Sequence, residues 1–352
     1  MFHYFCFENR NKALLKDFAR SAHGPVVKFY AALVALSLMM LCLCFSGCAG
    51  QKENPGSTLP DSRPLKVFCT IYPVYDFAKN VGKDKIDVYC LAPPGTEPHE
   101  WEPSPKDLAA IQKADLFVYC GAGMEGWIDK VLKVVTGPKL TVVDTSQGIP
   151  SLSGQEEESE TENEEKNGEP VHEHNTARDP HIWVDPVNAM KMVENITVGM
   201  VQADPANKDF YETNAREYLN ELEALNNAYR DSIARAAHKE FITSHAAFGY
   251  LAKRYGLNQV PIRGLSPEAE PTPARMAEVI KLVNEKKIRY IFFETLVSPK
   301  VSQIIAEEAG AETLVLNPVG GLTPDELNSG KNYLSVMREN LLNLQKALEV
   351  EP

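Results

Sequence analysis

The sequence lacks two features that would each point to a familiar class of protein. It has no excess of basic residues, because 36 Lys and Arg stand against 48 Asp and Glu, for a formal net charge of −12. A chain this acidic is a poor partner for nucleic acid and attracts cations. It also has no His-Glu-x-x-His motif and no Gly-x-Ser-x-Gly elbow, the patterns typical of zinc proteases and of α/β-hydrolases. Nucleic-acid binding and a familiar hydrolytic site are therefore not expected.

The chain also lacks an apolar run long enough for a comfortable bilayer span near its N-terminus. Residues 29–45 are mostly apolar, follow five basic residues and are typical of the core of a secretory signal. The run ends in Phe45-Ser46-Gly47-Cys48, which resembles the cleavage box of bacterial lipoproteins. We expect residues 1–47 to be a lipoprotein signal peptide, Cys48 to carry the lipid, and residues 48–64 to be a flexible tether. A simple membrane anchor or an ordinary secreted start is the alternative.

Cysteines are scarce in the expected mature protein. Three of the seven would leave with the signal and Cys48 would carry lipid, so that Cys69, Cys90 and Cys120 remain. An odd number in an exported protein argues against a full disulfide framework. Each of the three lies in or at the end of a predicted strand, so we interpret them as buried thiols. A metal–thiolate role is the alternative.

The rest of the chain alternates between strand and helix patterns, which predicts an α/β fold of two domains with parallel four-stranded sheets. We expect an N-terminal α/β domain over 65–206, with an acidic disordered loop at 154–176, and a C-terminal α/β domain over 238–352. Predicted strands are 65–70, 87–91, 116–119 and 141–144, then 240–243, 259–262, 289–293 and 313–316. Predicted helices are 74–81, 105–113 and 127–135, then 246–255, 272–286, 299–309 and 333–348.

A long helical pattern joins the two halves, over residues 207–237. Its apolar and aromatic residues recur every three or four positions: Tyr211, Ala215, Tyr218, Leu222, Leu225 and Tyr229. Such spacing places them on one helical face. The usual reason for a stripe of this kind is core packing. Its position between two α/β halves also makes it a candidate for one rigid linking helix.

Four residues that could bind a metal lie at or beyond strand ends. His99 follows the second predicted strand, His181 follows the fourth beyond the long insertion, His245 follows the first strand of the second half, and Glu294 ends the third. Open α/β sheets bind ligands at the C-terminal ends of their strands. Two residues come from each half, which predicts a site in the cleft between domains.

Neutral imidazoles with one carboxylate form a set of four ligands suited to zinc. A single histidine is more often a surface or hydrogen-bonded residue than a ligand, so this prediction depends on the coincidence of all four. The remaining candidates, His3, His23 and His238, have no comparable setting.

The segments around these four residues resemble a known family, the zinc-type solute-binding lipoproteins of metal-importing ABC transporters. The resemblance extends from about Lys66 to Ala347. It is carried by the following stretches of the sequence: Pro93 to His99 with Glu102 to Pro105, Asp179 to Trp183 with Asp185 and Pro186, Thr243 to His245 with Phe248 to Ala252, Phe293 to Thr295 with Lys300, and Leu316 to Pro318 with Gly321 and Leu322.

This resemblance implies two small α/β domains joined by a long helix, with little domain closure on metal loading. It further implies Zn²⁺ as the transported ligand, a membrane permease of the ABC type as partner, and an extracytoplasmic, lipid-anchored location. We expect a monomer that is not an enzyme.

The insertion within the N-terminal half is strongly acidic. Residues 155–174 contain nine glutamates together with His172 and His174, a composition typical of a solvated, disordered segment. Zinc-type members of the family have a His- and acid-rich loop at the similar place. His172 and His174 are therefore candidates for an auxiliary metal-gathering loop, although this loop is more acidic than histidine-rich.

Three alternatives remain open from the sequence. A zinc-dependent hydrolase would need a general base beside the metal, and Glu97 and Glu100 flank His99. A surface adhesin is compatible with a lipid anchor, but no repeat or binding module supports it. A manganese or broader divalent-metal carrier is the third alternative. Manganese-type relatives have a second carboxylate at the end of the last strand, where this chain has Asn317, so the ligand set favours zinc.

Overall fold

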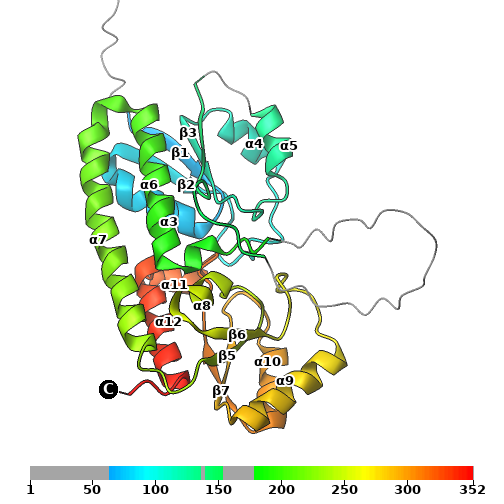
Figure 1. Ribbon diagram of the computed structural model, residues 1–352. Helices are drawn as coiled ribbons and strands as arrows, with labels where there is room; N and C mark the ends of the chain where they lie inside the picture. Colours follow the sequence, from blue (N-terminus) through cyan, green and yellow to red (C-terminus); the bar gives the residue numbers. More distant parts are fainter. Residues whose placement is uncertain (1–62, 136–138, 154–177, 352) are drawn as a thin grey trace, which may run out of the picture. The chain divides into compact units, whose positions relative to one another are not determined.

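The structure is a computed structural model that describes residues 63–135, 139–153 and 178–351. The described residues belong to one compact unit, Ser62–Pro352 (Figure 1). Among them, no helix is long and apolar enough to cross a bilayer. The signal peptide, Cys48, nearly all of the tether, His172 and His174 lie outside the described residues, so the expectations for them stay predictions.

The first half is a parallel sheet with the strand order β2-β1-β3-β4. Its strands are β1 (Leu65–Cys69), β2 (Ile86–Cys90), β3 (Leu116–Tyr119) and β4 (Thr141–Asp144). Its connecting helices are α3 (Tyr72–Gly82), the 3₁₀ turn Lys83–Lys85, α4 (Pro105–Ile111) and α5 (Ile128–Val134). At the start of α4, Ser104 and Asp107 form a capping box and Pro105 occupies the first turn, as the sequence favours.

The second half repeats this plan, with the parallel order β6-β5-β7-β8. Its strands are β5 (Glu240–Thr243), β6 (Asn258–Pro261), β7 (Tyr290–Phe293) and β8 (Glu312–Val315). Its helices are α8 (Gly249–Tyr255), α9 (Pro273–Lys286), α10 (Lys300–Ala309), α11 (Pro324–Asn328) and α12 (Tyr333–Ala347). The α/β class and the two parallel four-stranded sheets predicted from the sequence are confirmed. The domain boundaries stay a prediction, because the described residues fall into one compact unit.

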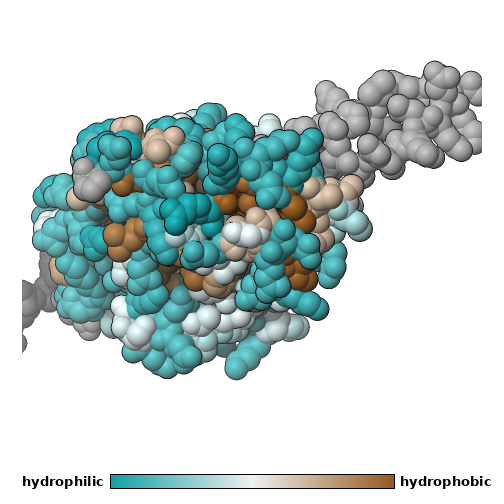
Figure 2. Space-filling model, turned by 90° about the horizontal axis from the view of Figure 1, so that it is seen from below, coloured by the Kyte–Doolittle hydropathy of each residue, from teal (hydrophilic) through white to brown (hydrophobic). Residues whose placement is uncertain are grey.

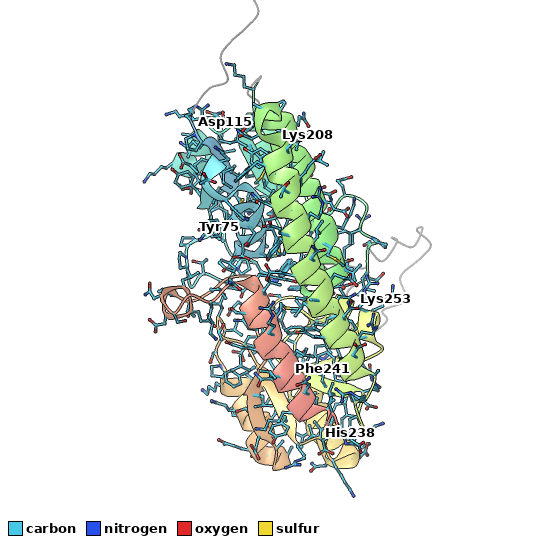
Figure 3. All side chains as sticks on the ribbon, turned by 90° about the vertical axis from the view of Figure 1, so that its left-hand side faces the viewer. Tyr75, Asp115, Lys208, His238, Phe241 and Lys253 are labelled. Atoms are coloured by element: carbon cyan, nitrogen blue, oxygen red, sulfur yellow. The ribbon has the colours of Figure 1, made fainter. Side chains whose placement is uncertain are left out.

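The long helix α7 (Lys208–Ile233) extends along both halves, between Lys208 and a point near His238 (Figure 3). It packs against α3 and α6 of the first half and against α12 of the second. All six residues of the predicted stripe are buried. The stripe therefore packs into the core and also links the two halves, since the same face of α7 contacts helices from both.

A second long helix, α6 (Pro186–Ala203), has no counterpart among the elements predicted above. The 3₁₀ turn Ile182–Val184 precedes it and the 3₁₀ turn Pro205–Asn207 separates it from α7. Asp185 caps α6 by accepting a hydrogen bond from the Val187 backbone, and Pro186 occupies its first turn. These are ordinary helix-start signals, which we had interpreted only as part of the histidine motif. The predictions for this segment were therefore incomplete.

The largest core cluster draws residues from both halves, including Val67, Phe77, Ile196, Leu222 and Phe292. Two smaller clusters cover the outer faces of the sheets, around Phe117 in the first half and Ile291 in the second. Viewed from below, the surface is mostly hydrophilic with smaller hydrophobic patches (Figure 2). A shared core holds the two halves together, and this fixes where their strand ends face each other.

Candidate metal centre

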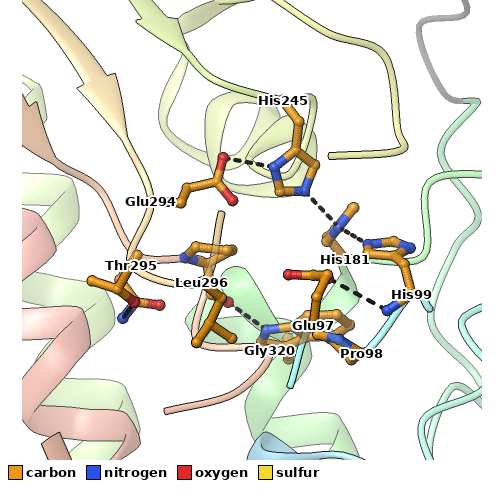
Figure 4. A pocket seen from close by; sticks show the side chains of 12 residues that line it. Glu97, Pro98, His99, His181, His245, Glu294, Thr295, Leu296 and Gly320 are labelled. Carbon is orange, nitrogen blue, oxygen red and sulfur yellow. Dashed lines mark hydrogen bonds and ion pairs between the residues drawn. The ribbon is translucent and has the colours of Figure 1, made fainter. Parts of the chain in front are cut away.

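The structure brings together the four residues predicted from strand ends. His99 lies in the loop between β2 and α4, and His181 lies directly before the turn that leads to α6. His245 follows β5 by two residues, and Glu294 directly follows β7. All four line one pocket at the carboxyl ends of the strands (Figure 4). Two of them come from each half of the chain, as the sequence predicted.

The Nε2 atoms of the three histidines converge on one point. Nε2 of His181 lies 2.9 Å from Nε2 of His99 and 3.3 Å from Nε2 of His245. One ligand atom from each of the three residues lies within 4.8 Å of the other two. A neutral imidazole with its proton on Nδ1 presents a lone pair at Nε2. Three such lone pairs repel one another unless a cation lies between them, so the arrangement suits a single metal ion.

Asp179 holds His181 in this orientation. Its Oδ1 lies 2.8 Å from Nδ1 of His181 and accepts a hydrogen bond from the His181 backbone N–H at 2.9 Å. Both residues are buried. The carboxylate keeps the proton on Nδ1 and directs Nε2 toward the pocket, the usual arrangement behind a metal-binding histidine. The sequence motif that contains Asp179 did not by itself assign it this role. The signal was a carboxylate two residues before a candidate ligand.

Glu294 orients His245 in the same way. Its Oε1 lies 2.6 Å from Nδ1 of His245 and also accepts a hydrogen bond from the Ser244 hydroxyl. Its Oε2 is buried and has no hydrogen-bond partner among the described residues. The three nitrogens that converge on one point do not include a Glu294 oxygen. Glu294 lies beside them, with Oε1 hydrogen-bonded and Oε2 without a partner among the described residues. A buried oxygen of this kind is costly unless something occupies the space beside it.

His99 is held less firmly than the other two histidines. It is half-buried, whereas His181 and His245 are each 1% exposed. Among the described residues its ring contacts no carboxylate; its backbone N–H donates to Oε1 of Glu97 at 3.4 Å. Burial, reinforced by the nearby His181 and His245, lowers the pKa of His99 to about 2. His99 is therefore neutral and ready to bind a cation at any ordinary pH.

The other ionisable groups of the pocket influence one another. Burial lowers the pKa of His181 and outweighs the opposing effect of Asp179. Burial also lowers the pKa of His245, but the charge and hydrogen bond of Glu294 raise it by more, so that its net pKa is raised. In return, His245 makes the net pKa of Glu294 lower than usual despite burial. Burial raises the pKa of Glu97 to about 7.

The pocket itself has a free volume of about 10 Å³, close to the minimum that one water molecule needs. Pro98, Trp183 and Leu296 also line it. Glu97, one of the two candidate bases, lines this pocket, whereas Glu100 is exposed. The space accommodates an ion but not an organic substrate.

Asn317 lines the pocket, but its side chain is already fully engaged. Nδ2 donates to Oγ1 of Thr295 at 2.9 Å and to Oε1 of Glu326 at 3.4 Å. Oδ1 accepts a hydrogen bond from the Val319 backbone at 2.8 Å. The position that a second carboxylate would occupy in a manganese-type site is therefore taken up by a structural amide.

His238 lies outside this site, in an exposed setting. Its side chain is 48% exposed, and Nε2 is 3.5 Å from Oε2 of Glu349. It is not among the residues that line the pocket. The three remaining thiols also stay outside it: Cys69 and Cys120 are buried, Cys90 is half-buried, and all three are free.

The chain matches one protein family over most of its length. The model of the family described as ZnuA, zinc-uptake complex component A, periplasmic, matches residues 67–347. The chain is 44% identical over 316 residues to the high-affinity zinc uptake system protein ZnuA of Bacillus subtilis, covering 90% of this chain and 98% of that protein. It is 42% identical over 319 residues to the zinc-binding lipoprotein AdcA of Streptococcus pneumoniae, covering 90% of this chain but only 61% of AdcA.

The fold also resembles solved structures of zinc-binding proteins. The crystal structure of the Zn(II)-bound ZnuA-like domain of Streptococcus pneumoniae AdcA is similar, with a TM-score of 0.69 and 40% sequence identity. The match covers 81% of this chain and 99% of that domain. This chain therefore corresponds to the ZnuA-like part of AdcA.

Proposed function

The chain belongs to the zinc-uptake complex component A family, and from this premise we propose that it captures Zn²⁺ outside the cytoplasm and delivers it to an ABC permease for import. The observation that carries the proposal is the convergence of the Nε2 atoms of His99, His181 and His245 on one point, with distances of 2.9 and 3.3 Å to His181. Three imidazole nitrogens are a set of ligands that zinc prefers.

Glu294 supplies the fourth ligand in this proposal. Its Oε2 is buried beside the three histidines and has no partner among the described residues, while Oε1 is engaged with His245. A zinc ion between the three nitrogens and Oε2 would satisfy this oxygen and complete a four-coordinate shell. The set then carries one negative charge against the two positive charges of the ion.

Carriage is favoured over hydrolysis by the size of the pocket. A hydrolytic zinc site needs an open position for water and room for a substrate beside it. The free volume of about 10 Å³ is taken up by the ion itself, which leaves no room for a substrate beside it. We therefore propose that the protein is not an enzyme, and that Glu97 is not a catalytic base.

Zinc titration of single variants tests the site. Alanine at His99, His181, His245 or Glu294 should weaken zinc binding by more than about 100-fold, since the remaining groups cannot close the coordination shell. The same variants should lose most of the rise in melting temperature that zinc gives the unmodified protein. His238→Ala is the matched control, because it removes an exposed imidazole of the same chemistry. Equal losses in His245→Ala and His238→Ala would contradict the proposed site.

A competition between metals tests the choice of ion. Imidazole-rich sites follow the Irving–Williams order of metal affinities, in which zinc binds far more tightly than manganese. Metal analysis of protein purified from unsupplemented cells should find zinc, and titration against a zinc chelator should give a much lower Kd for zinc than for manganese. Comparable affinities for the two ions would instead identify a general divalent-metal carrier.

We also propose that Cys48 carries the lipid that holds the protein at the membrane. The support is the Phe45-Ser46-Gly47-Cys48 sequence after an apolar run. Cys48→Ala should release or mislocalise the protein while zinc binding stays intact. Cys44→Ala, within the apolar run, should leave the location unchanged. A Cys48→Ala variant that stays in the membrane fraction after signal cleavage would contradict the lipid anchor.

A further inference from the structure

A second cavity lies behind the loop that carries His99. It has a volume of about 310 Å³, which is large enough for a small organic molecule. The first half of the chain contributes residues of α3, β2 and the loop after β2, and the second half contributes the segment before α11 and α11 itself. The lining residues include Tyr72, Tyr75, Val88, Cys90, Leu322 and Leu327.

None of the residues that line this cavity carries a charge at neutral pH. The cavity therefore selects against ions, in contrast to the small pocket of histidines and carboxylates. The rings of Tyr72 and Tyr75 lie with their centroids 6.1 Å apart and form an aromatic wall (Tyr75 is labelled in Figure 3). Apolar cavities of this size with a few polar groups are typical of sites for small organic molecules.

Polar groups on its lining are available to a ligand. The Tyr72 hydroxyl is occupied, because it donates to Oδ1 of Asp76 at 3.3 Å. In the part of the chain that the structure describes, the Tyr75 hydroxyl has no hydrogen-bond partner, and the thiol of Cys90 is free. An uncharged aromatic molecule with one hydroxyl or amine group would stack on the tyrosines and bond one of these groups.

Only two short backbone segments separate this cavity from the metal centre. Thr96 lines the cavity, and the next three residues line the metal pocket; Gly320 lines both. The segments are in close contact: the backbone N–H of Gly95 donates to the carbonyl of Leu322 at 2.9 Å. A Cβ on Gly320 would lie 2.9 Å from Cγ of Pro98, so the close approach of the two segments depends on glycine at this position.

We propose that this cavity is a second binding site, for a small uncharged aromatic molecule, and that its occupation strengthens metal binding at His99. The cavity and the converged histidines exist together in one arrangement of the chain. A molecule that fills the cavity bridges Thr96 and Leu322, and so stabilises the loop in the position that brings His99 to the metal. His99 is the ligand that benefits, since no carboxylate orients its ring in the described structure.

The coupling part of this proposal rests on the metal site proposed above, whereas the cavity itself does not. We expect 2-naphthol, used as the probe, to bind the metal-free protein at one saturable site, followed through its own fluorescence. Zinc should tighten that binding by about 5-fold or more. The probe should tighten zinc binding by the same factor, measured by competition with a chelator, because linkage is reciprocal.

Substitutions that fill the cavity supply the test of location. Leu327→Trp and Val88→Phe, one from each half of the chain, should each weaken probe binding by about 10-fold or more while zinc still binds. Leu342→Trp is the matched control, since Leu342 is 64% exposed on α12 and does not line the cavity. Retained zinc binding in the filled variants shows that they are folded.

Each outcome separates the claims. No saturable probe binding, or binding unchanged in both filled variants, would overturn the second site. Probe binding that zinc leaves unchanged would overturn the coupling alone. Failure of the unmodified protein to bind zinc, with probe binding intact, would instead overturn the proposed function.

Discussion

Nδ1 of His245 lies 2.6 Å from Oε1 of Glu294, deep in the pocket where both side chains are almost fully buried. One carboxylate thus both orients an imidazole and presents a second, unpartnered oxygen beside the converging nitrogens. The charge and hydrogen bond of Glu294 outweigh burial and raise the pKa of His245, so this imidazole keeps its second proton to a higher pH than a free one does. An incoming zinc ion has to displace that proton.

Zinc binding should therefore release protons near neutral pH. Metal ligands bind in their deprotonated form, so affinity is full above the raised pKa of His245 and falls as the pH drops through it. The lowered pKa values of His99 and His181 exclude these two residues as the source. Calorimetry in buffers of different ionisation enthalpy, from about pH 6.5 upward because that is the ordinary pKa of histidine, measures the number of protons released.

Glu97 provides the control for this measurement. Its pKa is raised to about 7, so the unmodified protein should release a further fraction of a proton from this carboxyl when the ion arrives. Glu97→Gln should abolish that fraction and keep the release that comes from His245. A zinc-binding constant that does not change with pH across this range would contradict proton release from His245 and Glu97.

Removal of Asp179 should weaken zinc binding without removing a ligand. Asp179→Ala frees Nδ1 of His181 and lets the ring rotate or change tautomer, which typically costs about 10- to 100-fold in metal affinity. Asp144→Ala is the matched control, since Asp144 bonds Ser146 and Gln147 rather than a histidine. Zinc titration of both variants checks the prediction. Equal affinities in the two variants would show that Asp179 does not position His181.

Asn317→Asp should destabilise the protein rather than create a manganese site. The substitution replaces the Nδ2 amide, which lies 3.4 Å from Oε1 of Glu326, with a second carboxylate oxygen. Losing buried hydrogen bonds and adding repulsion should cost about 1–3 kcal/mol in the free energy of unfolding, measured with urea. Manganese affinity should stay within about threefold, because the group faces Thr295 and Val319.

The double variant Asn317→Asp with Glu326→Gln should recover most of the lost stability, since the new carboxylate then has a neutral amide beside it. If Asn317→Asp instead tightens manganese binding by an order of magnitude, residue 317 belongs to the coordination shell after all.

Gly199→Ala should destabilise α6 against the first sheet. Alanine in a helix is favoured over glycine by about 1 kcal/mol, but a Cβ here would overlap Cγ2 of Val143. Overpacking of a core costs about 1–3 kcal/mol, so we expect a net loss in the free energy of unfolding. Gly126→Ala is the control, because nothing lies within 4 Å of a Cβ there and the change should be nearly neutral.

Local patterns in the sequence were sufficient for the class of fold and for the candidates at the site. Short apolar runs separated by helical periods determine strands and crossovers, and the stripe of α7 shows its packing face directly. The same logic placed His99, His181, His245 and Glu294 at the carboxyl ends of strands, where a parallel sheet presents its ligands. The helix signals at Asp185 and Pro186 were also present, but were assigned to the motif that precedes them.

Only the tertiary structure decided how these residues face one another. Whether Nε2 or Nδ1 of His181 and His245 points inward depends on a carboxylate partner. That partner is Asp179 in the same loop for His181, and Glu294 at the end of a different strand for His245. The amide of Asn317 is occupied by groups from two other segments. The cavity behind the His99 loop is likewise formed by both halves at once. Periodicity along a chain specifies elements and faces, but a contact between distant segments depends on the packing of the whole core.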